Sequence, residues 1–178
     1  MKIRMLYKII YSKLFPIKYA KKVGVNFPEG ELHLYGKIAW GSEPWIITLG
    51  KNVYITDNVR FITHDGGVLP FRKEIFDLEI TKPITVGDDV YFGNNVIILP
   101  GVNIGSRVIV GAGAVVTKDV PDTSVVVGIP ARRIKSVDEY LDKAKKESLH
   151  LGHLVGQEKD KKLMEYYNYT GSSKGIYY

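Results

Sequence analysis

Large apolar residues recur every six positions through the middle of the chain. They take the first position of nine six-residue segments, called hexads here, and a Val or Ala takes the fifth position in eight of the nine. Neither a helix of 3.6 residues per turn nor a simple alternating strand produces a period of six over such a length. The nine hexads begin at Leu49, Ile55, Phe61, Val86, Phe92, Ile98, Ile104, Val110 and Val116.

This period predicts an all-β solenoid in which short strands lie on the flat faces of a three-sided prism. Three hexads then make one coil, and residues 86–121 contain two full coils. The large first residue of each hexad points inward, and every coil buries its apolar side only against the neighbouring coils. Gly at the second position of five hexads suits a corner where a side chain would crowd. The alternative is a sandwich of short strands, which also shows regular spacing.

The repeat is interrupted once, between Phe61 and Val86. We interpret the 25-residue interval between these two residues as one full coil of 18 residues plus seven extra residues. The extra length predicts that residues 67–83 form a loop that leaves one corner of the prism and returns. Long loops on a rigid scaffold usually carry function.

Residues 1–23 predict a basic amphipathic helix with a break at Pro16. Two interpretations of this helix remain open. It covers the open end of the prism with its apolar stripe, or it lies on an anionic membrane surface. The apolar stripe consists of Met5, Leu6, Ile9, Ile10 and Leu14.

The flanks divide the chain into three parts. Residues 24–48 read as an irregular first coil, so the solenoid domain is expected to span residues 24–135. A Ser-x-x-Glu capping box at Ser136 opens a C-terminal segment, residues 136–178, which we expect to be helical to about Tyr167.

Charge and cysteine content narrow the function classes. The net charge is +6, yet residues 1–28 hold seven basic residues and no acidic one, so the rest is close to neutral. With no nucleic-acid-binding motif, this charge argues poorly for a nucleic-acid partner. The absence of Cys excludes disulfides and thiol nucleophiles and fits a reducing compartment. No signal peptide and no run of 18 apolar residues is visible, so we expect a cytoplasmic protein, with the inner face of the membrane as the alternative location.

The hexad FITHDG, residues 61–66, departs from the pattern. Its fifth position holds Asp65, a charge where an inward Val or Ala is expected, and a buried carboxylate is costly unless it is hydrogen-bonded. His64 precedes it at an outward position near a corner, and the long loop follows at once. The plain alternative is a surface His beside an Asp-Gly turn. We interpret the coincidence as a candidate active site.

The chain resembles a known enzyme family at this point. THDGG after a hexad, a loop, two regular coils, VVTKDVP and then VVVGIPAR are similar to the acetyl-CoA-dependent O-acetyltransferases of bacterial polysaccharide gene clusters. These belong to the wider galactoside, maltose and xenobiotic acetyltransferase family. The resemblance covers roughly residues 24–140. It implies a left-handed parallel β-helix and acetyl-CoA as the cosubstrate.

In that family, a His at the position of His64 is the general base. It takes a proton from the acceptor hydroxyl while that oxygen attacks the thioester carbonyl, a task that suits the ordinary pKa of histidine. A base needs a partner on its other ring nitrogen, and Glu43, Asp65 and a main-chain carbonyl are the candidates. Glu43 precedes His64 by 21 residues, one coil plus three, within the irregular first coil. Acceptor binding is assigned to Trp45, Phe71 and Arg72.

Coenzyme binding is expected at the last coils. Gly111, Ala112 and Gly113 leave one corner without bulk, so a pantetheine arm can lie along the main chain there, although Gly and Ala also simply suit a corner. Basic residues nearby would bind the coenzyme phosphates, although the Arg pair in GIPARR could equally lie on a solvated turn. The complete set of candidates is Gly93, Gly111, Ala112, Gly113, Lys118, Ala131, Arg132 and Arg133.

Outward residues of the hexads predict self-association. Sixth positions hold Tyr91, Ile97, Ile109 and Val115, and contiguous apolar surface usually marks an interface. We expect a homotrimer of parallel prisms with three shared active sites. His64 of one subunit would then face the glycine corner of another, and the loop would reach over the cleft between them.

A metal site is not expected. The γ-class carbonic anhydrases share the prism and bind zinc through three His, but two of the four His here, His150 and His153, lie in the C-terminal segment, away from His33 and His64. The sequence therefore favours an acetyltransferase acting on a sugar hydroxyl in surface polysaccharide assembly. The alternatives are an N-acetyltransferase for an amino sugar or small molecule, and a non-catalytic scaffold or binding module.

Overall fold

A computed structural model describes residues 10–171 of the chain. These residues form two compact units, one that ends at Asp138 and one that begins at Glu139. The first unit contains all the strands and the candidate site, and the second is helical.

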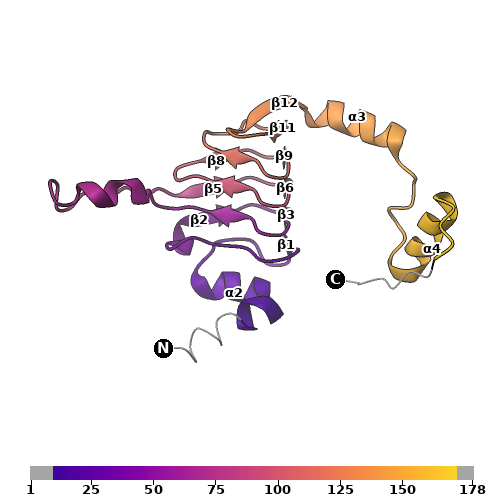
Figure 1. Ribbon diagram of the computed structural model, residues 1–178, viewed down its shortest axis with the longest axis horizontal. Helices are drawn as coiled ribbons and strands as arrows, with labels where there is room; N and C mark the ends of the chain where they lie inside the picture. The colour runs from indigo at the N-terminus through magenta and orange to yellow at the C-terminus, as the bar shows by residue number, and fades with distance from the viewer. Residues whose placement is uncertain (1–9, 172–178) are drawn as a thin grey trace. The chain divides into compact units, whose positions relative to one another are not determined.

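The first unit is built from three sheets of short strands, stacked coil on coil (Figure 1). The first sheet consists of β2 (Ile47–Leu49), β5 (Ile84–Val86) and β8 (Asn103–Ile104). The second consists of β1 (Leu32–Leu34), β3 (Val53–Ile55), β6 (Val90–Phe92), β9 (Val108–Val110), β11 (Ser124–Val127) and β12 (Arg132–Ser136). The third consists of β4 (Arg60–Phe61), β7 (Ile97–Ile98) and β10 (Val115–Val116). All pairings are parallel except β11 with β12, so a sandwich of antiparallel strands is excluded.

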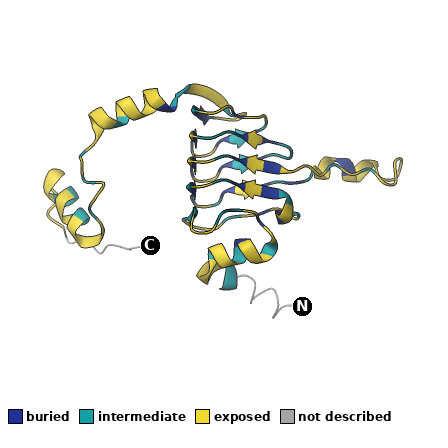
Figure 2. Cartoon of the chain, turned by 180° about the vertical axis from the view of Figure 1, so that it is seen from behind, coloured by how far each residue is buried: buried dark blue, intermediate teal, exposed yellow. Residues whose placement is uncertain are grey.

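The first residues of the nine hexads form three columns inside the stack. Every third hexad contributes to the same sheet, and its first residue lies in register with those of the coils above and below. All nine side chains are buried, and the inward-facing strand residues appear dark along the stack in Figure 2. The predicted inward positions are therefore correct, while the handedness of the coil stays a prediction. The columns are Leu49–Val86–Ile104, Ile55–Phe92–Val110 and Phe61–Ile98–Val116.

The corners of the coils are held by polar side chains. Asn52 Nδ2 donates to Asp89 Oδ1 at 2.7 Å, and Asn58 Nδ2 donates to Asn95 Oδ1 at 2.7 Å, each across to the next coil. All four residues have positive φ, which Asn and Asp tolerate better than other side chains. Gly87 is needed for a different reason, because a Cβ there would lie 2.5 Å from the Ser106 hydroxyl of the next coil.

The interruption of the repeat contains no additional coil. Leu49 pairs directly with Val86, so β5 lies immediately above β2 and the interpretation of one coil plus seven residues is wrong. The whole interval is instead one excursion from a corner, which Figure 1 shows projecting sideways from the stack. It begins with the 3-10 helix η2 (Gly66–Phe71). An antiparallel bridge between His64 and Thr81 closes its base.

The N-terminal helix breaks where the sequence predicts. Residues 10–14 are helical, Phe15 is not, and α2 (Pro16–Val23) begins at the proline. Figure 1 shows α2 beside β1 at the end of the stack. Ala20 is fully buried there, with Tyr19 and Val23 packed against the same core. This helix therefore covers the first coil, as one of the two interpretations expects.

The described members of the predicted apolar stripe do not make that contact. Ile10 and Leu14 are exposed, and Met5, Leu6 and Ile9 lie outside the described residues. The residues that pack on the first coil follow Pro16 in the chain. Within residues 10–171, none of the helices combines the length and the apolar character needed to cross a bilayer.

The C-terminal segment is two helices rather than one. The first, α3 (Val137–Glu147), begins directly after the predicted cap Ser136. The second, α4 (Gly156–Tyr166), is separated from it by a non-helical stretch in which His150 has a φ of 55°. The expected helix to about Tyr167 is therefore interrupted over residues 148–155.

The three columns predict where truncation is costly. Leu49→Ala should lower the free energy of unfolding by about 2–5 kcal/mol, because Leu49 is 1% exposed and its removal leaves a cavity beneath Val86. The adjacent Thr48 points outward on the same strand and is exposed, so Thr48→Ala should change stability by no more than about 0.5 kcal/mol. Urea unfolding followed by circular dichroism measures both. Equal losses would show that the columns are not the stabilising core.

Candidate active site

The first coil is longer than the regular 18-residue coils, and its length places Glu43 beside His64. Leu32 pairs with Val53 and Ala39 bridges Arg60, so positions in this coil stack on residues 21 further along. Glu43 and His64 have that same separation. The Glu43 Oε2 atom lies 3.1 Å from Nδ1 of His64. The irregular first coil thus supplies one of the two expected side-chain partners of the imidazole.

Thr63 completes the arrangement and was missed by the sequence reasoning. Its hydroxyl donates a 2.6 Å hydrogen bond to the same Glu43 Oε2 atom, and its side chain is fully buried. Gly41 packs against it with a φ of +71°, and a Cβ at that position would lie 2.8 Å from Thr63 Oγ1. The sequence offered one signal for this contact, a Thr in the hexad that breaks the pattern. It could not identify the partner of this Thr, because Glu43 lies in another coil.

The electrostatics favour an ionised Glu43. The hydroxyl of Thr63 is the main cause that lowers the pKa of the Glu43 carboxyl below its ordinary value; partial burial opposes this shift, and the imidazole of His64 adds to it. An ionised carboxylate only accepts hydrogen bonds. It therefore selects the imidazole tautomer with hydrogen on Nδ1, which leaves Nε2 with a free lone pair. The His64 side chain is 40% exposed, so this nitrogen is within reach of a substrate.

Asp65 does not occupy the inward slot that its hexad position predicts. It is exposed, and its carboxylate accepts a 2.9 Å hydrogen bond from the Gly67 amide at the start of η2. Its own amide donates to the carbonyl of Ile80 in the returning strand of the loop, at 2.9 Å. The expectation is wrong because the hexad frame already ends at Thr63 and Asp65 belongs to the base of the loop. Its carboxylate is therefore occupied in capping that helix.

The expected coenzyme corner joins β9 to β10. Ala112 and Gly113 are exposed there, and Gly113 has a φ of +72° with open space where a Cβ would be. Gly93 lies buried in the coil below, where a Cβ would come within 2.5 Å of the Ala112 amide nitrogen. Gly111 stands over Val127, whose side chain a Cβ would meet at 2.7 Å. Close coil-on-coil approach therefore explains Gly93 and Gly111, and Gly113 leaves a surface without side chains.

The basic candidates lie on the same end of the stack. Arg132 and Arg133 are exposed on β12, which follows the turn after β11. Ala131 donates its amide hydrogen to the carbonyl of Val115 at 2.8 Å, so this turn lies against β10. Lys118 is exposed after β10.

One chain does not bring the two halves of the candidate site together. His64 lies after β4, at the far edge of the sheet formed by β4, β7 and β10. The corner at residues 111–113 precedes β10, at the opposite edge of the same sheet. The two also belong to different coils, since β7 lies between β4 and β10. The base and the coenzyme corner therefore flank one face of the prism from opposite sides.

The acceptor candidates differ in their surroundings. Trp45, in the short 3-10 helix η1 (Pro44–Ile46) directly after Glu43, is 64% exposed, and Phe71 on the loop is 54% exposed. Arg72 is already engaged, because its guanidinium pairs with Glu79 and its Nε donates to the Leu78 carbonyl at 2.9 Å. Arg72 thus braces the loop internally.

Among residues 10–171, no cluster of three or more His, Cys, Asp or Glu side chains is arranged to hold a metal ion.

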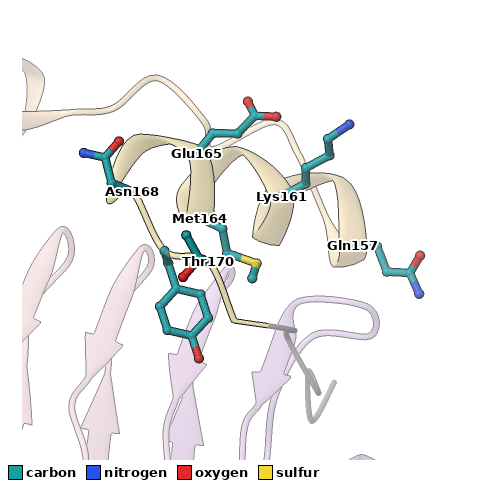
Figure 3. A pocket seen from close by; sticks show the side chains of 7 residues that line it. Gln157, Lys161, Met164, Glu165, Asn168 and Thr170 are labelled. Carbon is teal, nitrogen blue, oxygen red and sulfur yellow. The ribbon is translucent and has the colours of Figure 1, made fainter.

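A shallow hollow lies beside α4, outside the candidate site. Lys161, Met164 and Tyr169 line it together with neighbouring residues (Figure 3). All its lining residues come from α4 and the turn that follows, so the hollow shares no residue with the candidate site.

Known proteins are similar to this chain in sequence and in fold. Residues 83–118 match the model of the bacterial transferase hexapeptide (six repeats). Protein CapG of Staphylococcus aureus is 45% identical over 101 residues, which are 57% of this chain and 59% of that protein. The chain spans less than two thirds of the length of the first curated relatives that it matches.

Two solved structures share more of the chain. A maltose O-acetyltransferase from Clostridium difficile 630 is 26% identical with a TM-score of 0.54, covering 73% of this chain and 84% of that one. A galactoside acetyltransferase in complex with coenzyme A is 28% identical with a TM-score of 0.56, covering 72% and 71%. These matches confirm the resemblance to hexapeptide-repeat acetyltransferases that the sequence indicates.

The contact between Thr63 and Glu43 predicts a pKa change. Thr63→Val keeps the shape of the side chain but removes the hydroxyl, so the pKa of Glu43 should rise toward its ordinary value, whereas Thr63→Ser should retain the lowered pKa. Titration of the Glu43 carboxyl carbon by NMR measures this. Because the folded pKa is lowered, ionised Glu43 stabilises the fold above its ordinary pKa, and that contribution is lost as the pH falls. An unchanged pKa in Thr63→Val would refute the assignment.

Proposed function

We propose, from the likeness to hexapeptide-repeat acetyltransferases, that this chain transfers an acetyl group from acetyl-CoA to a hydroxyl of a sugar. The observation that carries the proposal is the contact of Glu43 with Nδ1 of His64, which leaves Nε2 free to accept a proton. The names of the similar structures, a maltose O-acetyltransferase and a galactoside acetyltransferase bound to coenzyme A, support the choice of acceptor and donor.

The proposed reaction needs no covalent enzyme intermediate. Nε2 of His64 takes the proton of the acceptor hydroxyl as the oxygen attacks the thioester carbonyl of acetyl-CoA. The carboxylate of Glu43 stabilises the imidazolium that forms and keeps the ring oriented. The tetrahedral intermediate then expels the thiolate, which receives the proton from His64. The products are the acetyl ester and free coenzyme A.

The acceptor side of the site rests on exposed aromatic rings. Trp45 follows Glu43 by two residues, and Phe71 lies on the loop that begins beside His64. Their exposed rings offer large apolar faces for a sugar ring. The amine of an amino sugar would react through the same base. Assays with both kinds of acceptor therefore decide between a hydroxyl and an amine. The role in surface polysaccharide assembly and the cytoplasmic location stay predictions from the sequence.

The proposed active enzyme is a homotrimer with a coil of left-handed sense. Two faces of the prism carry outward apolar residues in register, Tyr91 with Ile109 and Ile97 with Val115, whereas the face of β2, β5 and β8 carries polar residues. Tyr91 is 43% exposed and the other three are half-buried. A closed ring of three needs two different contact surfaces on each subunit. The β4–β7–β10 face is one of them, and it separates the base from the coenzyme corner in a single chain. A neighbour packed there would supply the missing half.

The base is tested by replacement. His64→Ala should lower kcat for acetyl transfer by about 10²–10⁴-fold, because the acceptor hydroxyl loses its proton acceptor. His153→Ala is the matched control, since that imidazole lies in the second unit, and it should leave the rate unchanged. Steady-state assays with maltose, galactosides and amino sugars as acceptors measure both. A near wild-type rate in His64→Ala would remove the residue from its role.

The shared site is tested by mixing inactive chains. Light scattering should give three times the 20.0 kDa chain mass. His64→Ala chains refolded together with Ala112→Trp chains should recover part of the activity, because a mixed interface pairs an intact His with an intact coenzyme corner. The control mixes His64→Ala chains with chains that carry both substitutions, which cannot form a complete site. A monomer, or mixed trimers without recovered activity, would contradict the shared site.

A further inference from the structure

The N-terminal helical segment exposes an apolar surface within the described residues. Ile10, Leu14, Phe15 and Ile17, called the N-terminal apolar face here, are 48%, 64%, 47% and 44% exposed. The contact of α2 with the first coil is made by other residues, Ala20 foremost among them. Figure 2 shows α2 largely in the colour of exposed residues. The side chains that close the prism and those of this face are therefore different sets.

Lysines border this face. Lys13 and Lys18 are exposed and are the sequence neighbours of Leu14 and Ile17. Lys18 Nζ lies 5.4 Å from the centre of the Phe15 ring. Lys21 follows on the same helix and pairs with Glu29 at 3.8 Å. No acidic residue precedes Glu29 in the chain. The surface thus combines bulky apolar side chains with a net positive charge.

This composition identifies the occupant. Protein interfaces are depleted in Lys, and two copies of the chain meeting through the same face would bring clusters of like charge together. An anionic bilayer surface instead attracts Lys side chains, whose long stems keep the ammonium group at the headgroups while apolar neighbours enter the acyl boundary. An amphipathic helix bound in this way lies in the plane of that boundary.

We propose that the N-terminal apolar face, together with Lys13 and Lys18, docks the protein on an anionic lipid surface. The apolar residues supply burial and the lysines supply attraction, two signals that together give reversible binding. The proposal stands on the helix alone and does not depend on the acetyltransferase assignment.

Sedimentation of the full chain with vesicles tests it. The protein should sediment with vesicles that contain equal parts of phosphatidylcholine and phosphatidylglycerol, and should stay in solution with phosphatidylcholine alone. Binding should weaken as the salt concentration rises, because screening shortens the reach of the lysines. Equal sedimentation with both kinds of vesicle, or with neither, would overturn the proposal.

Paired variants locate the surface. Leu14→Gln with Ile17→Gln, and separately Lys13→Gln with Lys18→Gln, should each reduce the fraction bound by about tenfold or more. The matched controls are Val155→Gln, an apolar side chain that is 79% exposed elsewhere, and Lys145→Gln with Lys146→Gln on α3. These controls should bind as the unchanged chain does.

Circular dichroism and light scattering on the same variants separate docking from folding and assembly. The expected result is an unchanged spectrum and an unchanged mass with lost vesicle binding. Undiminished vesicle binding in Leu14→Gln with Ile17→Gln would overturn the proposal, and so would a smaller particle mass, because the face would then contact another copy of the chain.

Discussion

The packing of one coil on the next is the constraint on which the rest of the structure depends. Each coil buries its inward residues only against its neighbours, so Leu49, Val86 and Ile104 must stay in register whatever lies between them in sequence. Additional residues can therefore leave only at a corner. The loop after His64 does this without displacing β5 from its place above β2, and its base is closed by pairing with the returning strand.

The same constraint builds the candidate site from an irregular coil. The first coil has no regular hexads, yet Leu32 and Ala39 keep a constant 21-residue offset from their partners. That offset carries Glu43 to His64. Thr63 then holds the carboxylate from the buried side, and its hydrogen bond keeps the charge on Glu43 that orients the imidazole. The proposed chemistry thus depends on a contact between two coils rather than on one motif.

Assembly and location would complete the function. His64 and the glycine corner flank one face of the prism, and in the proposed trimer a neighbouring subunit on that face would account for both its apolar residues and the separation of the two half-sites. The N-terminal helical segment has two roles, one in the core and one proposed at a lipid surface. Ala20 closes the core, while Leu14 and Ile17 are exposed near lysines.

The sequence by itself determined the large inward residue that opens each hexad, the corner glycines and the break at Pro16, because each depends on a local period or on the chemistry of one residue. It also singled out His64, whose role stays a prediction. Only the tertiary structure decided that Asp65 caps the loop helix, that no coil lies between Phe61 and Val86, and that Thr63 and Glu43 meet. These three depend on how long each coil is. Coil length is set by stacking across residues about 20 or more apart, which no local pattern records.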